Sequence, residues 1–386
     1  MIRRLAFVWL FLAALLFSFW PPQALYAEEN RLDRLEEEIK GLKGENDILR
    51  KRVDNVEADD EETKHSYASL SRLVDVSGYA DVEFSLTDQP GESSKFRLRH
   101  LSLFFSKDIQ KEWKLFTEIE FEDAPRILSD KNADTVASAQ GLIFLEQMYM
   151  QYHPAFDWDI RLGRFLTPAG VWTIYHYPPY VPTHVSPLIY KVMFPEVTDG
   201  VVLRKTFSVS NSNLDTHFYA ANGAGNPGSG DRNENKALGA RVNYSFDLQG
   251  SLDTGASYYR DKDNAGALHS SLGAHMIFSR PPFKFQGEYA LRRNNPEGAS
   301  GFSDMGYYAQ ITCDIGKWTL AGRYDWYDPD DTVSGNSMRR FTGAVNYHFA
   351  PNVAGKLEFN RNEKEDPAEA DYNELIFEIA VAIGDL

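Results

Sequence analysis

The most constraining feature of this chain is an alternation of apolar and polar side chains over its last four fifths. In residues 317–327, for example, Trp318 and Leu320 alternate with Thr319 and Arg323. A period of two residues is typical of β-strands, whose successive side chains point to opposite faces. Each alternating segment is about ten residues long, the length that a tilted strand needs to cross a bilayer core. The pattern therefore predicts membrane-spanning strands.

The turns between these segments alternate between two kinds. Seven are short, such as residues 108–112 and 314–316, and eight are longer and rich in Gly, Asn, Asp and Ser, such as 123–140 and 167–198. An even number of strands with short turns at one end and long loops at the other is typical of outer-membrane barrels. We predict an all-β fold, a sixteen-stranded antiparallel transmembrane β-barrel over residues 74–386. The alternative is a large soluble β-protein, because one wetted sheet face produces the same alternation.

Composition excludes several classes of protein. The net charge of −16 argues against a nucleic-acid partner, which requires a basic face. The single cysteine, Cys313, excludes an intramolecular disulfide and a CxxC metal or haem motif, and we assign no metal and no cofactor. Aromatic residues make up 13% of the chain, and many lie near strand ends, where they fit two interfacial girdles. This predicted girdle set includes the adjacent pairs Tyr258–Tyr259 and Tyr307–Tyr308.

The N-terminus predicts export from the cytoplasm. Residues 1–27 combine a basic start at Arg3 and Arg4 with an apolar run and a small residue, Ala27, at which cleavage is expected. The apolar run is about sixteen residues, shorter than the roughly twenty that span a bilayer as a helix. We therefore predict a signal peptide, with an uncleaved membrane anchor as the alternative.

Residues 28–57 change character and predict a helical coiled coil. Their apolar residues repeat with alternating spacings of three and four, and one asparagine occupies a core position. The predicted oligomerisation residues are Leu32, Leu35, Ile39, Leu42, Asn46, Leu49, Val53 and Val56. A single solvated helix is the alternative. Residues 58–73 form a polar linker between this helix and the barrel.

The polar side chains of the strands predict what the pore contains. A charged side chain in hydrocarbon costs about 2–4 kcal/mol at the bilayer midplane, so the charged residues are expected to face the lumen. The predicted pore-lining residues are Arg161, Arg204, Arg241, Lys284, Arg323, Arg340, Lys356, Glu118, Glu120 and Glu122. The two signs nearly cancel in number, so selectivity depends on how they are arranged.

Residues 167–198 form the longest predicted connection and are rich in proline and aromatic residues, which argues against disorder. We predict that this segment folds into the barrel and forms the constriction. An exposed outer loop or a contact between subunits is the alternative. The predicted constriction residues are Trp172, Tyr175, His176, Tyr177, Tyr180, His184 and Lys191.

Several segments resemble the phosphate-selective porin family of the O and P type. They are residues 96–105 (FRLRHLSLFF), 145–152 (LEQMYMQY) and 160–170, and the last contains the run G-x-F-x-T-P-x-G from Gly163 to Gly170. The resemblance implies a trimeric sixteen-stranded channel of the bacterial outer membrane, with the N-terminal coiled coil in the periplasm. This chain differs from the family's basic constriction in having one lysine, Lys191, in its long loop.

Two functions remain open from the sequence. The first hypothesis is an outer-membrane porin, a passive diffusion channel for small solutes or ions, with anions such as phosphate among them, and with lipid and two further copies of the chain as partners. The second is a structural outer-membrane protein whose coiled coil tethers the envelope. A barrel enzyme ranks last because no GxSxG motif is present, and we assign no catalytic residue.

Overall fold

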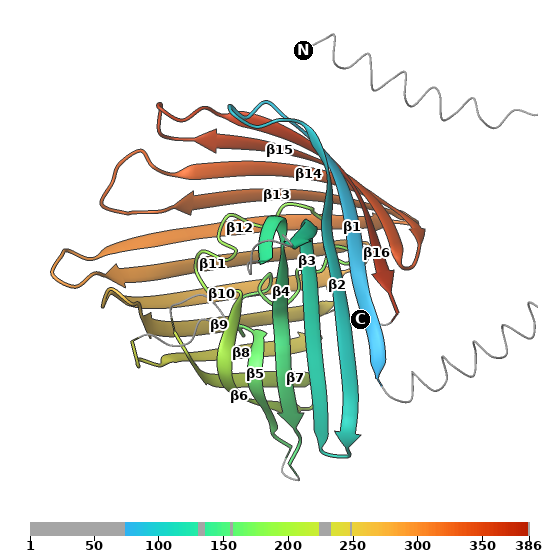
Figure 1. Ribbon diagram of the computed structural model, residues 1–386, viewed down its shortest axis with the longest axis vertical. Coiled ribbons are helices and arrows are strands. Elements are labelled where there is room, and N and C mark those ends of the chain that lie inside the picture. Colours follow the sequence, from blue (N-terminus) through green and yellow to red (C-terminus); the bar gives the residue numbers. More distant parts are fainter. Residues whose placement is uncertain (1–73, 130–135, 155–156, 224–232, 248, 385–386) are drawn as a thin grey trace, which may run out of the picture. The chain divides into compact units, whose positions relative to one another are not determined.

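The computed structural model describes residues 74–129, 136–154, 157–223, 233–247 and 249–384. The predicted signal peptide, coiled coil and linker, including all eight oligomerisation residues, lie outside this part of the chain. The described residues form sixteen strands (Figure 1). The strands are β1 (Asp75–Thr87), β2 (Lys95–Gln110), β3 (Trp113–Ser129), β4 (Val136–Tyr152), β5 (Asp159–Leu166), β6 (Val197–Val209), β7 (Ser212–Ala221), β8 (Ala237–Asp247), β9 (Ser251–Lys262), β10 (Leu268–Arg280), β11 (Phe283–Asn295), β12 (Phe302–Ile315), β13 (Trp318–Asp328), β14 (Met338–Ala350), β15 (Val353–Lys364) and β16 (Tyr372–Ile383).

The strands close into one antiparallel barrel, as predicted. Each strand pairs with its neighbours in sequence, and β1 pairs with β16, for example at Phe84 and Phe377. Closure gives every strand a partner on each side. Within the described residues, no helix combines the length and the apolar character needed to cross a membrane.

The connections follow the predicted asymmetry. Residues 111–112, 210–211, 281–282, 316–317 and 351–352 are two-residue turns at one end of the barrel, where residues 153–158 also join β4 to β5. The longest connections, such as residues 167–196 between β5 and β6, lie at the other end. Because the number of strands is even, β1 begins and β16 ends on the side of the short turns.

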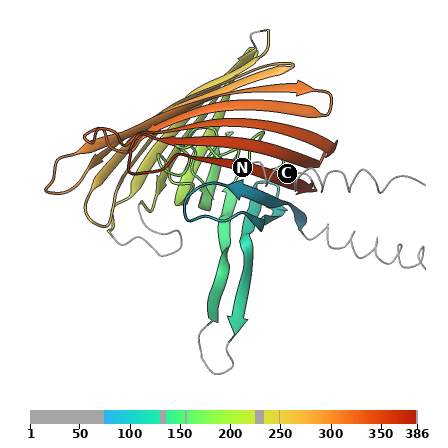
Figure 2. The ribbon, with the colours of Figure 1, turned by 90° about the horizontal axis from the view of Figure 1, so that it is seen from above.

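The prediction of a loop over residues 123–140 is wrong. Strand β3 continues to Ser129 and β4 begins at Val136, so most of this segment is a strand hairpin. Figure 2 shows this hairpin projecting beyond the neighbouring strands. Strands that leave the membrane still pair through their backbones, but nothing there requires an apolar outer face, so the alternation that identifies strands elsewhere is lost.

The two faces of the strands carry the expected side chains. On β13, Trp318 and Leu320 are exposed on the outer surface, whereas Thr319, Arg323 and Asp325 are buried inside. On β10, Leu272 and Met276 are likewise exposed outside, whereas Ser271 and His275 are buried inside. An apolar outer surface matches a lipid environment, because hydrocarbon cannot solvate charges.

The predicted aromatic girdle needs a correction at its adjacent tyrosine pairs. Tyr258 and Tyr307 are 38% and 39% exposed on the outer surface, but Tyr259 and Tyr308 are 5% and 2% exposed and lie inside. Neighbouring strand residues point to opposite faces, so only one member of each pair reaches the lipid side.

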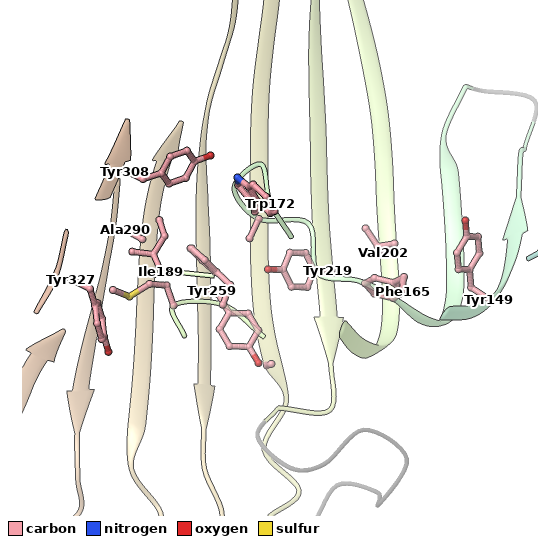
Figure 3. Close-up of a cluster of buried hydrophobic side chains, with 14 residues drawn as sticks. Tyr149, Phe165, Trp172, Ile189, Val202, Tyr219, Tyr259, Ala290, Tyr308 and Tyr327 are labelled. Atoms are coloured by element: carbon pink, nitrogen blue, oxygen red, sulfur yellow. The ribbon is translucent and has the colours of Figure 1, made fainter. Parts of the chain in front are cut away.

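The barrel interior is filled partly by apolar side chains. Trp172 and Ile189, from the connection between β5 and β6, pack with Phe165, Tyr219 and Tyr308 of the strands (Figure 3). These side chains are kept from water by the connection itself, which covers them from within the barrel. The connection therefore supplies a core that the single-layer wall lacks.

Candidate functional site

Residues 167–196, which join β5 to β6, form what we call the inner loop. Its first turn is held by Glu288 of β11, whose carboxylate accepts hydrogen bonds from the backbone N–H groups of Val171 (2.9 Å) and Trp172 (3.1 Å) and from the hydroxyl of Tyr308 (2.7 Å). Gly170 has a φ of 55° here, and a Cβ at this position would lie 2.1 Å from Glu288 Oε2. Only glycine allows this close approach.

The middle of the inner loop is held by a second carboxylate and a guanidinium. Glu358 of β15 accepts hydrogen bonds from the backbone N–H groups of His184 (2.5 Å) and Val185 (3.0 Å). Arg323 of β13 donates to Thr183 Oγ1 (2.6 Å) and to the carbonyl oxygen of Val185 (2.8 Å), and it pairs with Asp325 (2.8 Å). Backbone groups that cannot reach water are thereby satisfied by the barrel wall.

His184 lies between two glutamates of the wall. Its Nε2 is 2.7 Å from Glu83 and its Nδ1 is 2.9 Å from Glu378, and Lys356 also contacts Glu378 (3.3 Å) and donates to the carbonyl oxygen of Pro178 (2.5 Å). Burial by itself lowers the pKa of His184, but its hydrogen bonds and charge attraction to Glu378 and Glu83 outweigh burial and raise the pKa to about 10. His184 is therefore an imidazolium at neutral pH and acts as a fixed positive charge.

The end of the inner loop is held in the same way. Arg292 of β11 donates to the carbonyl oxygen of Val192 (2.6 Å) and forms a two-point pair with Asp304 (2.9 Å for both), while Ser271 of β10 donates to the carbonyl oxygen of Met193 (2.6 Å). The inner loop is thus fastened along one side of the barrel, from β9 through β16 to β1. These contacts place the inner loop inside the barrel, as predicted from the sequence.

The inner loop leaves a large cavity on its other side, which we call the basic chamber. It has a volume of about 810 Å³ and is bordered by Trp172, Tyr175, Tyr177 and Tyr180 of the loop. Its wall residues include Asp253, Ser279 and Lys284, which lie near the short-turn ends of β9, β10 and β11. The basic chamber therefore lies on the short-turn side of the inner loop.

Four cationic side chains line the basic chamber: Arg161, Arg204, Arg241 and Lys284. The guanidinium of Arg204 is 3.5 Å from Asp215, and Arg241 donates to the carbonyl oxygen of Gly170 (3.3 Å). Within the described residues, Arg161, Arg241 and Lys284 form no ion pair with a carboxylate. No carboxylate therefore neutralises these three charges; Lys284 is exposed to the chamber and Arg161 is half-buried, whereas Arg241 is buried and also holds the carbonyl of Gly170.

A smaller cavity of about 380 Å³, the acidic chamber, lies toward the long-loop side of the inner loop. It is bordered by β1, β2, β3 and β16 and contains more acidic than basic side chains. The carboxylates are Asp81, Glu83, Glu120, Glu122, Glu196, Glu374 and Glu378, and the cations are Arg97, Arg99, Lys191 and Lys356. Positive and negative side chains are thus concentrated in different regions of the barrel interior. Counting the charges in the sequence does not reveal this arrangement.

The predicted pore-lining residues occupy different positions in the interior. Arg161, Arg204, Arg241 and Lys284 border the basic chamber, and Glu120 and Glu122 border the acidic one. Arg323, Arg340 and Lys356 instead donate to backbone carbonyls of the inner loop. Glu118 is fully buried and accepts hydrogen bonds from Ser102 and Gln147.

The predicted constriction residues also have different positions. Trp172, Tyr175, Tyr177 and Tyr180 border the basic chamber, His176 and His184 border the acidic one, and Lys191 pairs with Glu196 (2.7 Å). The sequence reasoning did not single out Glu288 and Glu358 as loop anchors. Both occupy inward-facing strand positions, but this signal does not distinguish an anchor from a pore residue.

Comparison with known proteins places the chain in a family. A model of the Gram-negative porin family matches residues 66–367. Similar solved structures include an anion-selective porin from Comamonas acidovorans (13% identity, 80% of this chain and 99% of that one, TM-score 0.58) and the outer-membrane channel DcaP of Acinetobacter baumannii (12%, 80% and 96%, 0.54). A third is the trimer form of OmpT, an outer-membrane protein of Vibrio cholerae (11%, 80% and 98%, 0.56).

A search of curated proteins found no match. At these identities the solved structures establish the fold, and the family model extends over most of the chain. A closed barrel with an apolar outer surface, a loop fastened inside and a polar-lined chamber is the architecture of an outer-membrane channel. The chain belongs to the Gram-negative porin family.

Proposed function

We propose that this protein is a passive diffusion channel that favours small anions, with phosphate among the solutes it passes. The observation that carries the proposal is the basic chamber, in which Arg161, Arg241 and Lys284 make no ion pair within the described residues. Fixed charges of one sign in a narrow aqueous passage raise the local concentration of ions of the opposite sign.

The acidic residues of the interior do not oppose this preference in proportion to their number. Glu288 and Glu358 are occupied by backbone N–H groups of the inner loop, and Asp325 is paired with Arg323. Glu378 is paired with Lys356 and His184. These carboxylates hold the constriction in place, and their charges are compensated by the donors around them.

The proposed roles follow from these positions. Arg161, Arg204, Arg241 and Lys284 attract anions from the short-turn side, and Tyr175 and Tyr180 of the inner loop narrow the passage. Glu120 and Glu122 shape the field in the acidic chamber. The channel requires no cofactor and no catalytic group for passive diffusion.

Three further parts of the proposal concern assembly and location. We infer that residues 1–27 direct export, that residues 28–57 form a coiled coil in the periplasm, and that residues 58–73 link it to the barrel. A homotrimer is supported by the heptad pattern with its core asparagine and by the trimer form of the similar OmpT structure.

The test is electrophysiology of the purified protein in planar bilayers. In a KCl gradient, the reversal potential is expected to have the sign for chloride preference, and added phosphate is expected to reduce the chloride current. A reversal potential of the cation sign would refute anion preference. No current from correctly folded protein would refute the channel itself.

A further inference from the structure

Three carboxylates meet at a place that neither the loop anchors nor the basic chamber uses. Glu118 and Glu120 of β3 and Glu146 of β4 each place an oxygen within 4.8 Å of the other two. They are 0%, 6% and 2% exposed, so water does not compensate their charges. Buried carboxylates at this separation repel one another strongly unless a cation or shared protons lie between them.

The hydrogen bonds at this cluster leave one carboxylate incomplete. Glu118 accepts from Ser102 (2.8 Å) and Gln147 (2.6 Å), and Glu120 accepts from Tyr79 (2.6 Å). Glu146 Oε2 is fully buried and has no hydrogen-bond partner. A buried charged oxygen without a donor is costly. The independent indication of a ligand is His176 of the inner loop, whose two ring nitrogens are buried beside the cluster without a hydrogen-bond partner.

The backbone of β4 turns Glu146 toward the cluster. Glu118 pairs with Gln147 and Ile119 pairs with Leu145, so Glu146 is an extra residue in the ladder, a β-bulge. The bulge allows both Glu146 and Gln147 to face inward, although neighbouring strand residues normally alternate. Bulges of this kind serve to aim a side chain.

The inner loop places an imidazole beside the cluster. The imidazole Nε2 of His176 is 3.2 Å from Glu146 Oε1, and neither of its ring nitrogens makes a hydrogen bond. No lysine or arginine within the described residues pairs with Glu118, Glu120 or Glu146, and the nearby Lys191 is engaged by Glu196. The lysines and arginines of the described residues thus leave the charges of this cluster uncompensated.

We propose that Glu118, Glu120 and Glu146 bind one hard divalent cation of the Ca²⁺ class, with His176 of the inner loop beside it. Carboxylate oxygens are the ligands that such cations prefer, and Ca²⁺–oxygen distances of about 2.3–2.6 Å allow ligands up to about 5 Å apart across the ion, which fits the observed spacing.

The cation would fasten the one side of the inner loop that is weakly held. Toward β3 and β4 the loop makes a long contact between Gln147 Nε2 and the Tyr177 hydroxyl (3.4 Å) and the contact of His176 with Glu146. A bound cation joins this wall to the loop at the constriction. It also reduces the negative charge next to the acidic chamber, which Glu120 borders.

The test is calorimetric titration of the refolded, lipopolysaccharide-free full chain with Ca²⁺ in detergent. Wild type is expected to bind one high-affinity Ca²⁺ per chain. Glu146→Gln is expected to weaken this binding at least tenfold, whereas the control Glu374→Gln, which removes an acidic group of the same cavity outside the cluster, leaves it unchanged.

Two results would overturn the proposal. One is no saturable Ca²⁺ binding by wild type, which indicates that the three carboxylates share protons instead. The other is equal binding by wild type and Glu146→Gln. Should Glu146→Gln fail to fold, Glu118→Gln and the effect of EDTA on the melting temperature of wild type decide the question, because a cation-bound wild type melts lower in EDTA. The titration requires no ion conduction, so its outcome is separate from that of the channel experiment.

Discussion

Lys284 provides a direct test of the proposal that the basic chamber favours anions. It lies at the short-turn end of β11, is exposed to the chamber and forms no ion pair within the part of the chain that the structure describes. Lys284→Gln therefore removes one positive charge while leaving the loop anchors untouched. Lys317→Gln is the matched control, because its ammonium lies over the ring of outward-facing Tyr347, 6.0 Å from the centroid.

The size of the effect follows from the chamber. A volume of 810 Å³ corresponds to a sphere with a radius of about 6 Å. The interaction energy between an ion at its centre and a charge on its wall is then about 0.7 kcal/mol in water. Screening in 0.1 M salt reduces this to about 0.4 kcal/mol. Removing the charge lowers anion entry about twofold and raises cation entry by the same factor, so the permeability ratio falls about fourfold.

The assay is the reversal potential in KCl gradients centred on different concentrations. The decrease in the anion-to-cation permeability ratio for Lys284→Gln is expected to reach about sevenfold near 0.01 M and almost to vanish at 1 M, because the Debye length shrinks from about 30 Å to 3 Å. The ratio for Lys317→Gln is expected to equal that of wild type. An unchanged ratio for Lys284→Gln at low salt would refute the assignment of the chamber as the selective region.

Other predictions concern the inner loop and the N-terminal segment. Glu358→Ala leaves two buried backbone N–H groups without an acceptor, so the free energy of unfolding should fall by about 3 kcal/mol in urea titrations with lipid vesicles, whereas an unchanged value would exclude an anchoring role. The raised pKa of His184 contributes stability that is present below about pH 6.5 and is lost as the pH rises through about 10. In thermal melts from pH 6 to 11, wild type should therefore lose more stability than His184→Gln. Parallel curves of melting temperature against pH would contradict this. Deleting residues 28–57 should leave single-channel conductance unchanged, since the barrel closes without them, and lost conductance in correctly inserted protein would argue otherwise.

The barrel wall could be predicted from the sequence because lipid imposes one simple rule on it. Leu320 and Thr319 differ in polarity since one faces outward and the other inward, and this rule repeats along every membrane-spanning strand. The alternation applies only to strand residues that lie within the membrane. The β3–β4 hairpin beyond Glu122 pairs through backbone groups without any demand on its side chains, so its strands could not be recognised.

The roles of the interior charges depend on a relation that no local pattern contains. Lys284 and Arg323 are both cations at inward-facing positions of β-strands, and the local sequence pattern does not distinguish them. Arg323 lies at mid-strand, where the inner loop crosses and takes its hydrogen bonds, whereas Lys284 lies nearer the short turns and remains available to ions. The path of one thirty-residue connection, far from both residues in sequence, thus decides which charges hold the inner loop and which face the basic chamber.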